Sequence, residues 1–223
     1  MRASRAAAWA VAAAFVLAAC GGSSTTDSVD TTAPSPPADD AVVTTTTAAV
    51  ATSTTAADAG VAAYAERMAL VDEAVAAWRV APTVAAAQEA AEAAANLVVG
   101  PNGPGYGDRD GDGVVSGATD AGVLPGLDGA PAGLAIPLAG NACIDADVLG
   151  GSWDDPEARW GEMLDAIDAW RPGNNTMPTL ASHPMRVVGW ATFTLDTDSL
   201  DEAHEYAGHA KLHVDISVRA LDC

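Results

Sequence analysis

The sequence predicts an all-α fold: a helical bundle of about five helices, with a long Gly/Asp-rich irregular insertion and one disulfide. Three observations support it. Alanine is abundant, while aromatic residues make up only 5% of the 223 residues. Apolar residues recur at helical spacing in several segments. Residues 100–152 hold 14 of the 21 glycines, and glycine disfavours regular helix. The expected folded domain, residues 58–223, is large enough for one hydrophobic core.

The first two helices are bounded by clear signals. Apolar side chains repeat every three or four positions over residues 58–80, and Pro82 ends that helix. Thr83 can cap a second helix over residues 84–99, which stops at Gly100. This second helix is so rich in alanine that we expect it to pack closely against a neighbour.

Three more helices follow the insertion. Asp155 is an N-cap followed by a proline suited to the first helical position, and the helix ends before Pro172. Residues 184–195 carry valines and threonines that favour a strand, but their length and helical neighbours favour a helix. The capping box Ser199–Glu202 opens the last helix, which runs close to Leu221.

The charge of the chain limits its partners. Asp and Glu number 30 against 10 Lys and Arg, a formal charge of −20. Binding to nucleic acid depends on surface Lys and Arg that displace counterions, so nucleic acid is not an expected partner. Docking on anionic lipid through a basic patch is disfavoured for the same reason.

The N-terminus has the features of an export signal. Two arginines precede fourteen apolar residues, too few to span a bilayer as a helix. The segment Leu17-Ala18-Ala19-Cys20 resembles the bacterial lipobox. The resemblance implies a signal peptide over residues 1–19, diacylation of Cys20, and a protein of the cell envelope that is anchored to the membrane by lipid outside the cytoplasm. The alternative is a buried N-terminal helix.

A linker separates this signal from the folded domain. Residues 20–57 contain eleven threonines, no aromatic residue and no Lys or Arg. Such a segment buries too little apolar surface to offset the entropy of ordering. We expect a flexible tether that holds the domain away from the membrane.

The cysteines predict one disulfide. If Cys20 carries lipid, Cys143 and Cys223 have one possible pairing, and thiols outside the cytoplasm tend to oxidise. The alternative is two buried free thiols.

The strongest chemical signal is an acidic loop within the insertion. Its carboxylates alternate along the chain and are followed by glycine, a spacing that wraps oxygen ligands around calcium. The candidate ligands are the side chains of Asp108, Asp110 and Asp112, the Val114 carbonyl, Ser116 and Asp120. We also expect Val115 to attach the loop to the core.

The loop resembles the calcium loops of EF-hand proteins and, more closely, of dockerins. The resemblance covers about a dozen residues and implies calcium binding at those positions. It departs from the pattern at the twelfth position, which is Thr119, with Asp120 one residue later. A second copy, which dockerins carry, is absent from the sequence. The alternative is a solvated Asp/Gly turn that needs no ion.

The histidines suggest a second metal site. Glu205, His209 and His213 fall on one face of the last predicted helix, where they could bind zinc, copper or iron. The alternative is a solvated pair of histidines on a helix surface, which is the more common arrangement.

Three functions are therefore compatible with the sequence. The first is a non-enzymatic, membrane-anchored helical domain with a structural calcium site and an unidentified protein or small-molecule partner. The second is a surface protein that binds a transition metal through its histidines. The third is an extracytoplasmic hydrolase, suggested by abundant carboxylates and by tryptophans that could line a groove, although core packing suits those tryptophans better.

Overall fold

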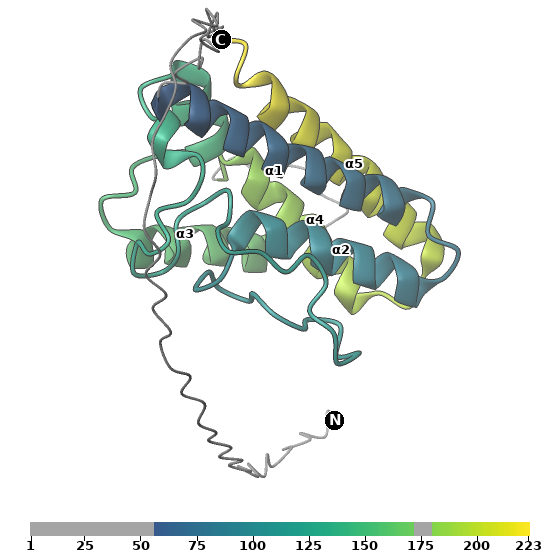
Figure 1. Ribbon diagram of the computed structural model, residues 1–223. Coiled ribbons are helices and arrows are strands. Elements are labelled where there is room, and N and C mark those ends of the chain that lie inside the picture. Colours follow the sequence, from purple (N-terminus) through teal and green to yellow (C-terminus); the bar gives the residue numbers. More distant parts are fainter. Residues whose placement is uncertain (1–55, 172–179) are drawn as a thin grey trace, which may run out of the picture. The chain divides into compact units, whose positions relative to one another are not determined.

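The computed structural model describes residues 56–171 and 180–223, which fold into α-helices without strands, as the sequence predicts (Figure 1). The predicted helix boundaries agree with the observed ones to within a few residues. The α-helices are α1 (Ala56–Arg79), α2 (Val84–Val99), α3 (Pro156–Ala169), α4 (His183–Asp196) and α5 (Leu200–Arg219).

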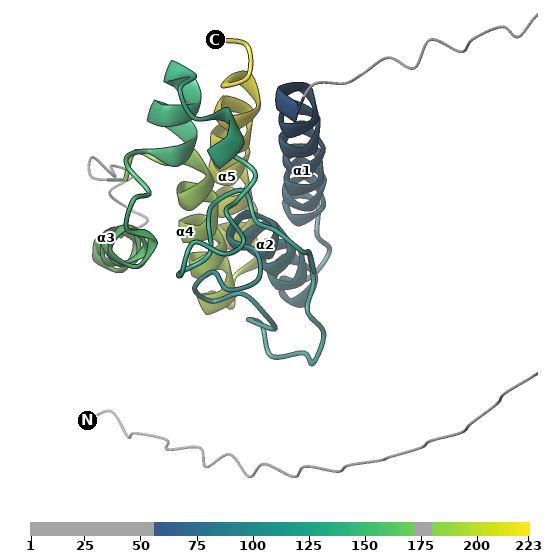
Figure 2. The same cartoon turned by 60° about the vertical axis from the view of Figure 1, so that its left-hand side comes forward.

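Four of these helices surround a common core. Helix α1 packs against α2 and α5, and α4 packs against the same two helices from the other side. Helix α3 lies to one side of this group and contacts α4 (Figure 2). The expected bundle is therefore a four-helix core with a fifth, peripheral helix.

The core is built from the apolar stripes of the helices. In α1, the residues that recur at helical spacing are buried, whereas Val61 at its start is exposed. Each large apolar side chain that is fully buried contributes about 1.5–3 kcal/mol. The buried residues of α1 are Tyr64, Met68, Val71, Val75 and Trp78.

Side-chain caps fix where the helices begin. The backbone N–H of Ala86 donates to Thr83 Oγ1 (3.2 Å), and that of Ala158 donates to Asp155 Oδ1 (3.0 Å). Ser199 Oγ accepts from the backbone N–H of Glu202 at 3.3 Å. Each cap satisfies a backbone donor that has no partner inside its helix. All three predicted caps are confirmed.

The insertion, residues 100–152, packs against α2 (Figures 1 and 2). The backbone N–H of Leu124 donates to the Val98 carbonyl at 3.2 Å. Glycine permits this close approach, because a Cβ at Gly117 would lie 2.3 Å from the Ala93 carbonyl oxygen. The sequence did not predict the two short helical segments within the insertion, a 3-10 helix (Ile136–Leu138) and a π-helix (Ile144–Leu149).

The predicted disulfide is confirmed. Cys143 and Cys223 are joined, with their Cα atoms 6.0 Å apart and a sequence separation of 80 residues. The bond ties the start of the π-helix to the chain just beyond α5. On the chain-entropy model, closing a loop of this length stabilises the fold by about 4–5 kcal/mol.

The predicted signal peptide, the lipidation site Cys20 and the linker as far as residue 55 lie outside the described residues. Among the helices that are described, none combines the length and apolar character needed to cross a membrane.

Candidate functional site

The acidic loop curls around its own carboxylates. Asp108 accepts backbone hydrogen bonds from Gly111 N–H (2.8 Å) and Gly113 N–H (2.9 Å), one at each oxygen. The backbone N–H of Asp112 donates to Asp110 Oδ1 at 3.0 Å. Because the two glycines have φ values of 80° and 92°, the loop can turn this tightly without strain.

A buried carboxylate of α2 accepts hydrogen bonds from the backbone of the acidic loop. Glu92 is fully buried. Its Oε1 accepts from the Ser116 N–H at 2.7 Å, and its Oε2 accepts from the Asp110 N–H at 3.0 Å and from the Arg109 N–H. A carboxylate buried in this way would be costly without such partners. The three donors fix both ends of the acidic loop on α2.

Glu92 completes a group of three acids. Glu92, Asp108 and Asp110 each offer one carboxylate oxygen, and these oxygens lie within 4.8 Å of one another. Calcium binds oxygen at about 2.3–2.6 Å, so two of its ligands are at most about 4.6–5.2 Å apart. The spacing of the three oxygens is therefore compatible with one shared ion.

The electrostatics of this group favour a cation. Burial raises the pKa of Asp110, although the hydrogen bond from the Asp112 backbone N–H opposes the shift. The negative charges of Glu92, Asp112 and Asp108 raise the pKa further. A bound cation would relieve this repulsion.

The other predicted calcium ligands lie outside that group. Asp112 accepts the Val114 N–H at 2.7 Å, at an exposed position. The Asp120 carboxylate is 98% exposed and lies 3.7 Å from Arg67 on α1. Ser116 reaches Glu92 through its backbone N–H.

The expectation for Val115 is wrong. Val115 is 39% exposed and Val114 is 59% exposed, so neither attaches the loop to the core. Polar contacts with α2 hold the loop instead.

Asn96, one turn after Glu92 on α2, supplies further contacts with the acidic loop. This fully buried side chain donates to the carbonyls of Gly107 (2.9 Å) and Ser116 (2.7 Å) and accepts the Gly107 N–H at 3.1 Å. One turn before Glu92, Gln88 donates to carbonyls at the end of α4. Sequence analysis missed all three residues. The signal was their spacing of four within an Ala-rich helix, which places them on one face.

The predicted histidine site is arranged differently from expectation. Nδ1 of His213 lies 2.9 Å from Nδ1 of His183, which belongs to α4. His209 stacks on Trp190 with ring centroids 4.4 Å apart, and its Nε2 is 3.9 Å from Glu205 Oε1. Among the described residues, Glu205, His209 and His213 do not form a group with ligand atoms within 4.8 Å. The structure instead brings together His183 and His213.

The paired histidines are neutral at physiological pH. Burial, together with the nearby His183, Arg186 and His209, lowers the pKa of His213 to about 3. Burial and Arg186 also lower the pKa of His183, while Asp147 opposes that shift. One imidazole can then donate its Nδ1 proton to the other.

The tryptophans that could have lined a groove belong mainly to the core. Trp160, Trp170 and Trp190 are buried, and Trp153 is half-buried. Trp170 packs edge-on against Trp190, with ring centroids 4.1 Å apart.

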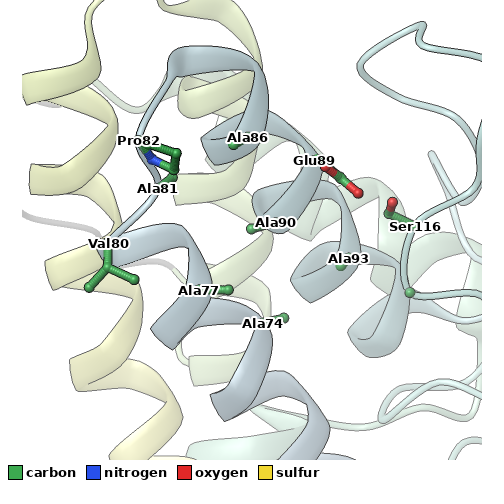
Figure 3. A pocket seen from close by; sticks show the side chains of 11 residues that line it. Ala74, Ala77, Val80, Ala81, Pro82, Ala86, Glu89, Ala90, Ala93 and Ser116 are labelled. Carbon is green, nitrogen blue, oxygen red and sulfur yellow. The ribbon is translucent and has the colours of Figure 1, made fainter.

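An apolar groove of about 470 Å³ lies where the end of α1 meets the start of α2 (Figure 3). Alanines of both helices line it, together with Val80, Glu89 and Ser116. Apolar side chains dominate the lining of this groove.

Comparisons with protein families, with curated proteins and with solved structures found no match to this chain. The case for a function therefore depends on the geometry of the loop and its neighbours.

Proposed function

We propose that this chain is a lipid-anchored extracytoplasmic domain that binds calcium at its acidic loop and serves a binding or envelope role rather than a catalytic one. The observation that carries the calcium site is the convergence of buried Glu92 with Asp108 and Asp110, whose oxygens lie within 4.8 Å of one another.

Glu92 can replace the acidic ligand that the loop lacks at its twelfth position. EF-hand-like loops use an acid at the twelfth position, and this loop has Thr119 there. Glu92 supplies a carboxylate from a neighbouring helix in its place. Its Oε2 accepts two backbone hydrogen bonds, whereas its Oε1 accepts one, from Ser116, and keeps a second lone pair for a cation.

The proposed role of the ion is structural. The loop joins α2 through Glu92 and Asn96, and three carboxylates repel one another where they meet. Calcium would cancel that repulsion and fix the insertion on the bundle. Anchoring to the membrane is proposed from the resemblance of the segment ending at Cys20 to a lipobox.

The test is the thermal midpoint of the full-length protein, first in EDTA and then in calcium. Free calcium at about 100 times its dissociation constant adds about 2.7 kcal/mol, a rise of about 5–10 °C for a domain of this size. We expect Glu92→Gln to lose most of this rise. Glu89→Gln is the matched control, because Glu89 is exposed on the same helix and the charge change is equal.

Two outcomes would reject the calcium proposal. The first is a wild-type midpoint that calcium leaves unchanged. The second is an equal rise in Glu92→Gln, which would place the ion elsewhere.

The second candidate function, transition-metal binding, is favoured by the convergence of His183 and His213 at 2.9 Å. Two imidazoles could provide part of a zinc or copper site. We expect zinc to raise the midpoint in the wild type and in His204→Gln, and to have no effect in His213→Gln. An equal zinc effect in all three proteins would reject this site.

A further inference from the structure

A second cavity, of about 550 Å³, lies between the insertion, α3 and α4. Its apolar wall comes from Leu164 and Ile167 of α3 and from Val188 and Phe193 of α4. Cavities of this size and mixed lining are typical of small-molecule sites.

Arg109 brings a charged group into this cavity. Its backbone N–H is held by Glu92, and its side chain lines the cavity. Its Nη2 donates to Thr192 Oγ1 at 3.1 Å. Its Nη1 is buried and has no hydrogen-bond partner among the described residues. Buried donors are nearly always paired in folded proteins, so an unpaired one needs an explanation.

The guanidinium is oriented and stays charged. Burial lowers the pKa of Arg109, while the negative charges of Glu92 and Asp196 raise it. An arginine remains protonated in such surroundings. The hydrogen bond to Thr192 restrains the orientation of the guanidinium.

The polar residues of the cavity are balanced in charge. Arg171 lines it as well, and its Nη1 donates to the carbonyls of Asp168 (2.7 Å) and Trp170 (2.5 Å). The side chains of Asp168 and Asp196 provide the opposing negative charges. Two of the ten cationic residues of this acidic chain therefore line one cavity, so its local charge differs from that of the surface as a whole.

We propose that this cavity binds a small organic acid with an apolar body. The carboxylate pairs with the guanidinium of Arg109, which lines the cavity, and the apolar body packs against Ile167 and Val188. A guanidinium and a carboxylate form one of the stronger hydrogen-bonded pairs in proteins. This binding site goes beyond the calcium proposal and does not require an ion in the loop.

The test uses the full-length protein with hexanoate as probe and hexanamide as its uncharged counterpart, both measured by saturation-transfer NMR titration. We expect saturable binding of hexanoate and at least tenfold weaker binding of hexanamide, which corresponds to about 1.4 kcal/mol. Arg109→Gln should weaken hexanoate binding at least tenfold. Arg79→Gln, which removes an exposed charge from α1, should leave it unchanged.

A second variant tests the cavity independently, in case Arg109→Gln fails to fold. Leu164 is 39% exposed at the cavity wall, so Leu164→Trp should fill the cavity while leaving the loop intact. We expect it to abolish hexanoate binding and to keep the wild-type circular dichroism spectrum.

Three results would overturn the proposal: no saturable hexanoate binding by the wild type, equal affinities for hexanoate and hexanamide, or unchanged binding in a folded Leu164→Trp. The calcium midpoint, measured on the same protein, separates the two proposals. A calcium shift without hexanoate binding rejects only the cavity, and hexanoate binding without a calcium shift rejects only the ion site.

Discussion

The four-helix core and the acidic loop of the insertion are held together by different forces. The core buries long apolar stripes, such as Tyr64 to Trp78 on α1, and its stability is spread over many contacts. The insertion contributes apolar side chains such as Leu124 and Ile144 to that core, but its acidic loop is fixed by a few polar side chains of α2, chiefly Glu92 and Asn96. Loss of one contact should therefore matter more in the acidic loop, and the effect should stay local.

The largest expected effect comes from removing the covalent link between the later part of the insertion and the end of the bundle. Cys143→Ser together with Cys223→Ser should lower the free energy of unfolding by about 4–5 kcal/mol, because the unfolded chain regains the entropy of an open loop. Urea unfolding of the double variant and of the wild type measures this difference. A loss below about 1 kcal/mol would mean that the disulfide adds little to what already holds the insertion.

A smaller effect is expected from Asn96→Ala. It removes three hydrogen bonds to the half-buried backbone of Gly107 and Ser116, each worth about 0.5–1.5 kcal/mol. Amides of residues 105–117 should exchange with solvent faster, while those of α5 stay protected.

Gln88→Ala is the matched control for this change. Gln88 lies on the same face of α2, but its contacts go to the end of α4. Its loss should speed exchange near Thr197 and leave the acidic loop unchanged. If both variants sped up amide exchange in the acidic loop equally, the expectation that losing one contact has only a local effect would be contradicted.

The effect of pH belongs to the helical bundle and, near neutral pH, is the smallest of those expected. His213 has a pKa of about 3 in the folded protein, below the ordinary value of about 6.5. The unfolded chain therefore binds a proton more readily between these values, and stability falls as pH drops from about 6.5 toward 3. The slope from this group is at most about 1.4 kcal/mol per pH unit.

Replacing His213 tests that slope. His213→Gln should flatten the loss of stability between pH 6 and 4, measured by urea unfolding at each pH. His204→Gln serves as the control, because His204 donates to the Ala81 carbonyl at another place on α5. Identical pH profiles of the wild type and His213→Gln would contradict the lowered pKa.

The same contrast explains what the sequence could predict. Helix α2 was predicted over its full range because its cap Thr83 and its stop Gly100 are local signals. The segment of α4 was correctly assigned as helix despite its valines and threonines, because burial between neighbouring helices outweighs intrinsic strand preference.

The candidate site was predicted only in part. The alternating Asp108, Asp110 and Asp112 identified the loop, because a loop motif is contiguous in sequence. The contribution of Glu92 could not be predicted, because it contacts loop residues that lie 17 to 24 positions away in the sequence. His183 was missed for a similar reason, since its approach to His213 depends on how α4 packs against α5.

The polar face of α2 also limits how this chain can change over evolutionary time. Gln88, Glu92 and Asn96 reach their separate targets because they follow one another at single-turn intervals. Deleting or inserting one residue among them would rotate those on one side of the change by about 100° relative to the others. A change of length between residues 88 and 96 would therefore uncouple the acidic loop from the bundle.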